Sequence, residues 1–458
     1  MRVLKHIFTL WLSFISIDSI AQSEKEILVI ENNILKKCDC EKIPANGHVV
    51  IPYFVKTIAK EAFKGCHRLK SIEIPNTVEI VEERAFFDCY NLNKIDLSRV
   101  FEIKKSAFAY CTNLTEITLG DGLKSIEDNA FESCFKLQSI TLPNSLTTLG
   151  NEAFSQCKEL ANVTLSENLI HLPFKVFYEC KSLKIIEIPK KTLHIRASAF
   201  AFCESLTSVY FLGNLESIGN DAFEHCVSLK EIELPDSVVH LGASAFFNCS
   251  ALEWIGLPAY LTQIKNDTFS GCNSLKEIHF PSGIEKIGMH AFRNCSSLIS
   301  LDLPISLTDI LFGAFNECTS LKIIKFAENV NYIGIFAFAN CVSLEKVELP
   351  KSVVKIEDRV FYDCRNLASV KLSSHTNSIG VQAFSGCEKL KKIDLPATLN
   401  YIGVEAFRNC SSLEEIICRA STPPQVNLSL GYKGVVIVPK KSQEAYLQDD
   451  IWKQMIIK

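Results

Sequence analysis

The sequence predicts a solenoid, a right-handed stack of short coils whose strands form a parallel β-sheet, and three observations predict it. A phenylalanine, in most cases preceded by alanine, recurs sixteen times at nearly constant spacing. A cysteine follows each of these phenylalanines three residues later. Leucines and isoleucines return at fixed places between them. Self-similarity of this kind indicates a repeat architecture, in which each coil is buried by its neighbours.

The chain begins with a segment that resembles an export signal. Residues 1–21 carry Arg2 and Lys5, then an apolar run, then small residues at Ser19 and Ala21. This order predicts a signal peptide cleaved after Ala21. The alternative is a membrane anchor, but an apolar run of about ten residues is too short to cross a bilayer of about 30 Å. We therefore expect an exported chain, at the cell surface, secreted or periplasmic, with no transmembrane helix after cleavage.

The period of the repeat is 23 residues. Every step between successive phenylalanines has this length except the step from Phe86 to Phe108, which is 22. The series consists of Phe63, Phe86, Phe108, Phe131, Phe154, Phe177, Phe200, Phe223, Phe246, Phe269, Phe292, Phe315, Phe338, Phe361, Phe384 and Phe407.

Residues 137–157 show how one coil is built. Ile140 and Leu142 alternate with polar residues and precede Pro143, which predicts a short strand ending in a turn. A second apolar pass follows, and then Ala153-Phe154 and Cys157, spaced to share one helical or 3-10 turn with their side chains inward. Glycine often follows the second pass, and we expect a corner with positive φ there. These glycines are Gly150, Gly219, Gly242, Gly288, Gly334, Gly380 and Gly403.

The pattern Leu-x-x-Ile-x-Leu-Pro-x-x-Leu-x-x-Leu-Gly-x-x-Ala-Phe-x-x-Cys, as in residues 137–157, resembles the BspA-like leucine-rich repeats of bacterial surface and secreted proteins. The resemblance covers residues 51–418, about sixteen repeats. It implies a curved leucine-rich repeat solenoid with parallel strands on the concave face and short helical or 3-10 turns on the convex side. Residues 22–50 would form an N-terminal cap and residues 419–458 a C-terminal cap. The resemblance implies adhesion or binding and carries over no catalytic residue.

Sixteen of the nineteen cysteines occupy one position of the repeat. We interpret them as small buried side chains with free thiols. Metal binding would need convergent pairs, whereas these cysteines stand singly. Disulfides are the other alternative, since an exported protein meets an oxidising environment, but parallel Cβ directions disfavour them. Cys38 and Cys40 precede the first full repeat, and a separation of two residues is poor for a mutual bond.

No motif predicts catalysis. The ten histidines show no His-Glu-x-x-His spacing, and the chain has neither a phosphate-binding loop of the Walker type nor a Gly-x-Ser-x-Gly elbow. We expect no catalytic, cofactor or metal site. The net charge of −4 also lacks the strongly basic character of general nucleic-acid binders.

The outward positions of the predicted strands are the candidate surface for a partner. In the middle of the array they combine aromatic and acidic residues, the types that anchor interfaces. Gly256 beside Trp254 would leave room for a ligand. The alternative is that scattered surface aromatics have no role. The candidate partner-binding residues are Tyr210, Glu231, Glu233, Trp254, Glu277 and His279.

The sequence therefore predicts an exported, non-enzymatic binding protein, adhesin-like, whose partner is a protein or a glycan. A structural or scaffolding component of the cell envelope without a specific ligand is the alternative.

Overall fold

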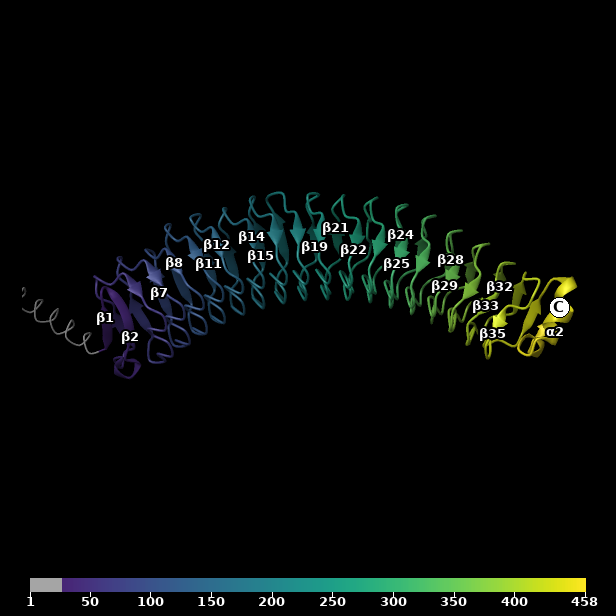
Figure 1. The fold of residues 1–458 in the computed structure, drawn as a ribbon, viewed down its shortest axis with the longest axis horizontal. Helices are drawn as coiled ribbons and strands as arrows, with labels where there is room; N and C mark the ends of the chain where they lie inside the picture. The colour runs from purple at the N-terminus through teal and green to yellow at the C-terminus, as the bar shows by residue number, and fades with distance from the viewer. Residues whose placement is uncertain (1–26) are drawn as a thin grey trace, which may run out of the picture. The chain divides into compact units, whose positions relative to one another are not determined.

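The computed structural model describes residues 27–458, so the predicted signal peptide lies outside the described residues. The described chain consists of two compact units, the first ending at Gly213 and the second running from Asn214 to Lys458. Within each unit, successive coils lie side by side and build a parallel solenoid (Figure 1). The predicted solenoid of stacked coils with parallel strands is confirmed.

All coils except that of residues 275–280 contribute a longer strand to one column and a two-residue strand to another, and we call these the long-strand and short-strand columns. In the first unit, the hairpin β1 (Leu28–Glu31) and β2 (Ile34–Cys38) and the 3-10 turn η1 (Cys40–Lys42) precede them. Its long strands are β3 (His48–Val50), β5 (Ser71–Glu73), β7 (Lys94–Leu97), β9 (Glu116–Leu119), β11 (Ser139–Thr141), β13 (Asn162–Thr164), β15 (Ile185–Ile188) and β17 (Ser208–Phe211). Its short strands are β4 (Thr57–Ile58), β6 (Ile80–Val81), β8 (Glu102–Ile103), β10 (Ser125–Ile126), β12 (Thr148–Leu149), β14 (His171–Leu172) and β16 (His194–Ile195).

The second unit repeats this arrangement. Its long strands are β19 (Glu231–Glu233), β21 (Trp254–Gly256), β24 (Ser300–Asp302), β26 (Ile323–Lys325), β28 (Lys346–Glu348), β30 (Ser369–Lys371), β32 (Lys392–Leu395), β34 (Glu415–Cys418) and β36 (Val435–Ile437), followed by β37 (Ile456–Ile457). Its short strands are β18 (Ser217–Ile218), β20 (His240–Leu241), β22 (Gln263–Ile264), β23 (Lys286–Ile287), β25 (Asp309–Ile310), β27 (Tyr332–Ile333), β29 (Lys355–Ile356), β31 (Ser378–Ile379), β33 (Tyr401–Ile402) and β35 (Gln425–Val426).

The second unit ends in a different structure. The 3-10 turns η2 (Lys440–Ser442) and η3 (Trp452–Gln454) flank helix α2 (Gln443–Gln448). Tyr446 and Trp452 are fully buried and meet edge to face, with ring centroids 5.2 Å apart. The Trp452 indole N–H donates to the carbonyl oxygen of Pro424, 2.9 Å away. These two aromatic side chains thus cover the apolar end of the last coil.

The core of each unit is a stack of phenylalanines. All sixteen repeat phenylalanines are buried. Neighbouring rings lie nearly parallel, with centroids 4.8 Å apart for Phe63 and Phe86 and 5.2 Å apart for Phe292 and Phe315. In each coil, the segment that contains the repeat phenylalanine forms consecutive turns. Its backbone also hydrogen-bonds to the next coil, as when the Phe292 N–H donates to the carbonyl oxygen of Ala314 at 2.8 Å.

The repeat cysteines bond each coil to the coil before it. The Cys157 thiol donates to the carbonyl oxygen of Phe131 at 3.3 Å, and the Cys295 thiol to that of Phe269 at 3.2 Å. The same bond recurs along both units, between residues 26 apart except for Cys111 and Phe86, which are 25 apart because their step is one residue shorter. A thiol fits here because it is small and apolar yet still donates a hydrogen bond.

Most cysteines are free and buried, as predicted, but one bond departs from that expectation. Cys40 and Cys66 form a disulfide, and the other seventeen cysteines carry free thiols. Cys40 lies 26 residues before Cys66, the separation that elsewhere joins a cysteine to the phenylalanine of the preceding coil. The first repeat has no phenylalanine before it, so Cys40 takes that place and a covalent bond replaces the hydrogen bond.

The prediction of positive φ at the corner glycines is wrong. None of those glycines has positive φ. They are required for close approach instead: a Cβ on Gly242 would lie 2.3 Å from the carbonyl carbon of Gly219, and one on Gly150 only 2.2 Å from the Asp128 nitrogen. Positive φ occurs two residues before and two after each repeat phenylalanine, as at Glu152 and Gln156.

Candidate functional site

The long strands β19 and β21 place four predicted residues side by side. On β19, Ile232 points into the core while Glu231 and Glu233 are exposed. The parallel register sets Glu231 beside Trp254 and Glu233 beside Gly256. Trp254 is partly exposed. An indole ring therefore lies on the surface next to a carboxylate, and a second carboxylate lies two residues along the strand.

The space above Gly256 is occupied. A Cβ on Gly256 would lie 2.4 Å from Oε2 of Glu233, so the Glu233 side chain folds over this glycine. The expectation that Gly256 leaves room for a ligand therefore needs correction. The absence of a Cβ at Gly256 leaves space that the Glu233 carboxylate of the neighbouring coil fills.

Glu277 and His279 lie on the next coil, but not on a strand. Residues 275–280 have no strand conformation, and this is the one coil in the described part of the long-strand column that lacks a strand. The Lys276 N–H still donates to the Glu253 carbonyl oxygen at 3.3 Å, so the coil remains next to β21. The His279 ring and the Glu277 carboxylate are 3.7 Å apart and both exposed.

The acidic side chains on these neighbouring coils differ in whether they have a partner. Lys276 bonds the Glu253 carboxylate at 2.5 Å, and this hydrogen bond lowers the pKa of Glu253. The backbones of Glu231 and Glu233 pair with β21, but their carboxylates make no hydrogen bond or ion pair within residues 27–458. We call Glu231, Glu233, Trp254, Glu277 and His279 the Trp254 face.

Tyr210 is the sixth predicted residue, and it belongs to the first unit. It lies on β17 with about half of its side chain exposed, at 51%. The register of β15 and β17 places it beside Glu187. Within the second unit, the structure brings the other five predicted residues together.

A shallow hollow of about 350 Å³ borders His279. Ile305, on the turn after Pro304, is 60% exposed at its rim. The sequence analysis missed this hollow, although an exposed isoleucine after a proline and the weak strand pattern around Phe280 are signals for it. The lining residues are Ile278, His279, Phe280, Ser282, Asp302, Leu303, Pro304 and Ile305.

Comparison with known proteins identifies the family. The model of the BspA type leucine-rich repeat region matches residues 28–158, 124–253, 241–367 and 332–422. The chain belongs to the BspA-type leucine-rich repeat family. The earlier resemblance is thereby confirmed, and a fold of this family is consistent with a protein-binding role.

Two solved structures resemble this BspA-type protein. A leucine-rich repeat protein from Bacteroides ovatus is 32% identical with a TM-score of 0.63, and the match covers 80% of this chain and 90% of that one. A leucine-rich cell surface protein from Faecalibacterium prausnitzii is 26% identical with a TM-score of 0.46, covering 68% and 93%. No curated protein matches the chain.

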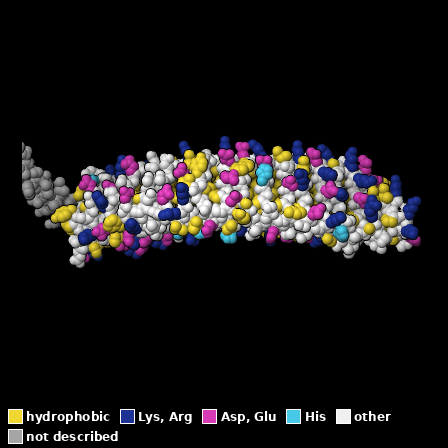
Figure 2. Space-filling model, turned by 90° about the horizontal axis from the view of Figure 1, so that it is seen from above, with side chains coloured by type: hydrophobic (Ala, Val, Ile, Leu, Met, Phe, Trp, Pro, Cys, Tyr) yellow, Lys and Arg dark blue, Asp and Glu magenta, His cyan; other side chains and the backbone are white. Residues whose placement is uncertain are grey.

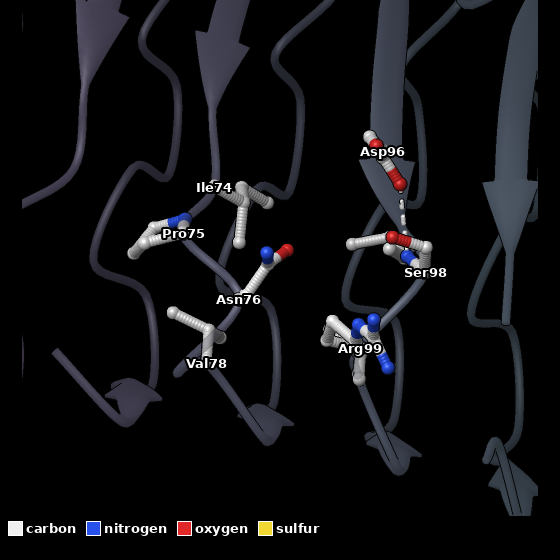
Figure 3. A pocket seen from close by; sticks show the side chains of 9 residues that line it. Ile74, Pro75, Asn76, Val78, Asp96, Ser98 and Arg99 are labelled. Carbon is white, nitrogen blue, oxygen red and sulfur yellow. Dashed lines mark hydrogen bonds between the residues drawn. The ribbon is translucent and has the colours of Figure 1, made fainter. Parts of the chain in front are cut away.

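A second hollow in the BspA-type protein has a local structural cause. It lies in the first unit between residues 74–78 and 96–100, where Asp96 accepts a hydrogen bond from the Ser98 N–H at 2.9 Å (Figure 3). The 22-residue step from Phe86 to Phe108 lacks one residue here, between Leu97 and Val100. The hollow has no room for a water molecule, so it is a packing consequence of the deletion rather than a ligand site.

Other kinds of site find no support in the described part of this BspA-type chain. Residues 27–458 contain no group of three or more potential metal ligands and no helix long and apolar enough to cross a membrane. Figure 2 shows positive and negative side chains interspersed on the visible face.

Proposed function

We propose that this BspA-type protein is an exported, non-enzymatic binding protein, adhesin-like in role, and that the Trp254 face contributes to binding a protein or glycan partner. The observation that carries the proposal is the partly exposed Trp254 beside two carboxylates that have no partner of their own. Tryptophan and tyrosine are enriched among the residues that dominate binding energy. Tyr210, exposed in the first unit, is a second candidate contact.

Capture of a partner tests the binding role. The purified chain would be immobilised and exposed to extracellular matrix, mucin and envelope fractions. We expect Trp254→Ala to weaken capture by about tenfold or more, because an interface tryptophan commonly contributes 2 kcal/mol or more. The matched control is Tyr332→Ala, an aromatic residue of the short-strand column that is 38% exposed. Unchanged capture by Trp254→Ala would contradict the role of this face, and no capture by the unaltered chain would favour the scaffolding alternative.

Fractionation of cells tests export. We expect the mature chain outside the cytoplasm with Gln22 as its first residue, because the small residues at 19 and 21 fit a signal-peptidase site. Mass spectrometry of the N-terminal peptide measures this directly. Replacing Ala21 with a bulky residue such as Tyr should leave a longer, uncleaved chain. A cytoplasmic protein that retains Met1 would contradict the proposal.

A further inference from the structure

We propose that this BspA-type protein forms a dimer in which strand β1 of one copy pairs antiparallel with β1 of a second copy about a two-fold axis. The inference goes beyond the proposed function and does not involve the Trp254 face. Three features carry it: the free edge of β1, the direction of its unused backbone hydrogen-bonding groups, and the apolar side chains of the strand.

The strand β1 has a free edge. It is the outermost strand of the sheet that the short-strand column of the first unit forms, and within residues 27–458 it pairs only with β2. Figure 1 shows it at the N-terminal end of that unit. A strand edge without a partner is a template for another strand, and most proteins protect such edges with charge, proline or a covering segment.

The residues of β1 that turn their backbone groups to this edge are Leu28 and Ile30. Leu28 lies opposite Cys38, and Ile30 lies opposite Leu35. Both partners use their backbone on the other side of β2, where the Cys38 N–H donates to the next coil at 2.7 Å and the Leu35 carbonyl accepts at 2.9 Å. Residues opposite each other in an antiparallel pair exchange either both bonds or none. The N–H and carbonyl groups of Leu28 and Ile30 therefore point away from β2.

A second copy satisfies these groups by symmetry. With the two-fold axis at Val29, Leu28 of one copy lies opposite Ile30 of the other, and each such pair exchanges two hydrogen bonds. All the outward N–H and carbonyl groups of both residues are then used. An axis at Leu28 or at Ile30 would leave one of the two without a partner on β1. The favoured register sets the Val29 residues of the two copies opposite each other, with Cα atoms about 4.5 Å apart.

The side chains of β1 favour this pairing over exposure to water. Leu28, Val29 and Ile30 are consecutive apolar residues, and Val29 is 51% exposed. In the dimer the two Val29 side chains pack against each other on the outer face of the sheet. On the other face, Leu28 of one copy lies beside Ile30 of its counterpart. Cross-strand apolar pairs of this kind stabilise a sheet.

The first strand of the long-strand column is protected in a way that β1 is not. At the outer edge of β3, the His48 N–H donates to the side chain of Asn46 at 3.1 Å. Near β1 the exposed side chains are apolar instead. Tyr53, 80% exposed, and Phe54 lie on a turn that the Lys56 N–H joins to the hairpin loop. The described part of the chain thus leaves an apolar strand edge uncovered at this end.

Association of the chain tests the inference. The chain that starts at Gln22, as signal cleavage would leave it, should be a dimer with a micromolar dissociation constant in sedimentation equilibrium. Val29→Lys should weaken the dimer at least about tenfold, because two ammonium groups would face each other across the axis. The matched control Val239→Lys changes a valine that is 46% exposed in the second unit and should leave association unchanged.

A charge exchange separates loss of pairing from loss of folding. Val29→Glu should weaken the dimer as Val29→Lys does, and an equimolar mixture of the two variants should associate again, because an ammonium group then faces a carboxylate. An unaltered chain that is monomeric at about 100 µM would overturn the inference. A dimer that neither variant weakens would overturn it as well.

Cross-linking tests the register. Val29→Cys should form a disulfide between copies on mild oxidation, because a Cα separation of about 4.5 Å lies within the disulfide range. In the matched control Glu31→Cys, the residue lies opposite Ile27 of the other copy, about 13 Å from its own counterpart, and should not cross-link. The free native cysteines are buried and should not contribute. Equal cross-linking of the two variants on a non-reducing gel would contradict the two-fold pairing.

Two other occupants of the edge would give different results. If residues 22–26 of the same chain cover β1, the chain is monomeric and removing those residues makes it dimerise. If a strand of another protein is the partner, the chain is monomeric and Val29→Lys lowers capture of that protein from envelope fractions. Either result would overturn the second copy as the occupant.

Discussion

Replacing Phe315 with alanine is expected to lower the free energy of unfolding by about 4 kcal/mol, as for other buried phenylalanines. The Phe315 ring is fully buried and stacks between Phe292 at 5.2 Å and Phe338 at 5.3 Å. Alanine would leave a cavity that the coils on either side cannot fill, since their backbones are bonded to each other through the Ala-Phe turns. Urea unfolding followed by circular dichroism measures the change.

Phe312 in the same coil is the matched control. It is 38% exposed and meets His290 and Phe336 edge to face, at 5.1 and 5.7 Å. Phe312→Ala should cost about 1 kcal/mol, the value of aromatic contacts at a surface. Equal losses from the two substitutions would contradict the account of the core as a phenylalanine stack.

Unfolding is expected to make the free cysteine thiols, which are unreactive in the native protein, accessible to thiol reagents. In the native protein at pH 8, Ellman's reagent should react with few or none of the seventeen free cysteines, because all of them are buried. Burial also raises the pKa of their thiols, to about 12 for Cys249, so the reactive thiolate is scarce. In denaturant all seventeen should react within minutes.

Prior reduction provides the control for the disulfide. Unfolded and reduced protein should show two more reactive thiols than unfolded, unreduced protein, from Cys40 and Cys66. Tandem mass spectrometry would place the bond between these two cysteines. Rapid reaction of many thiols in the native state, or bridges between neighbouring repeat cysteines, would contradict the structure.

The architecture could be predicted because the period is nearly invariant. A residue that recurs every 23 positions must occupy equivalent places in successive coils, which fixes the phenylalanine stack and the buried cysteines without knowledge of the backbone. The disulfide had a signal that went unused: Cys40 lies 23 residues before Phe63 and so stands at the phenylalanine position of an earlier, incomplete coil.

The backbone conformation was harder to predict from the sequence than the repeat period. The residues with positive φ, such as Glu152 and Gln156, are chemically varied from coil to coil. Their N–H groups donate to the next coil, to the carbonyl oxygens of Phe174 and Tyr178. The position two residues after the phenylalanine often holds glycine, asparagine or aspartate, as at Gly271, Asn248 and Asp88, and these residues adopt the left-handed conformation most readily. The corner glycines were the misleading signal, because there glycine is required for close approach of neighbouring backbones and not for positive φ.

The candidate site was also predictable only in part. The alternation of apolar and outward-facing residues predicted which residues of β19 and β21 face outward. The structure agrees for Glu231, Glu233 and Trp254. The position of the Glu233 carboxylate over Gly256 and the missing strand around Glu277 depend on contacts between coils. Such contacts join residues 23 apart and cannot be inferred from either segment alone.

The thiol-to-carbonyl bonds have a consequence for how such a chain can change in length. Each bond joins residues separated by three more than the local step, 26 for a step of 23 and 25 for the step of 22, so each of these cysteines depends on a phenylalanine of the previous coil. Excising 23 consecutive residues gives each surviving cysteine an equivalent acceptor and rejoins the apolar layers, whereas excising 20 or 26 misaligns every layer beyond the cut. Gene duplication and loss in whole periods is thus the tolerated route by which this architecture grows or shrinks, leaving its interior chemistry unchanged while new outward side chains accumulate.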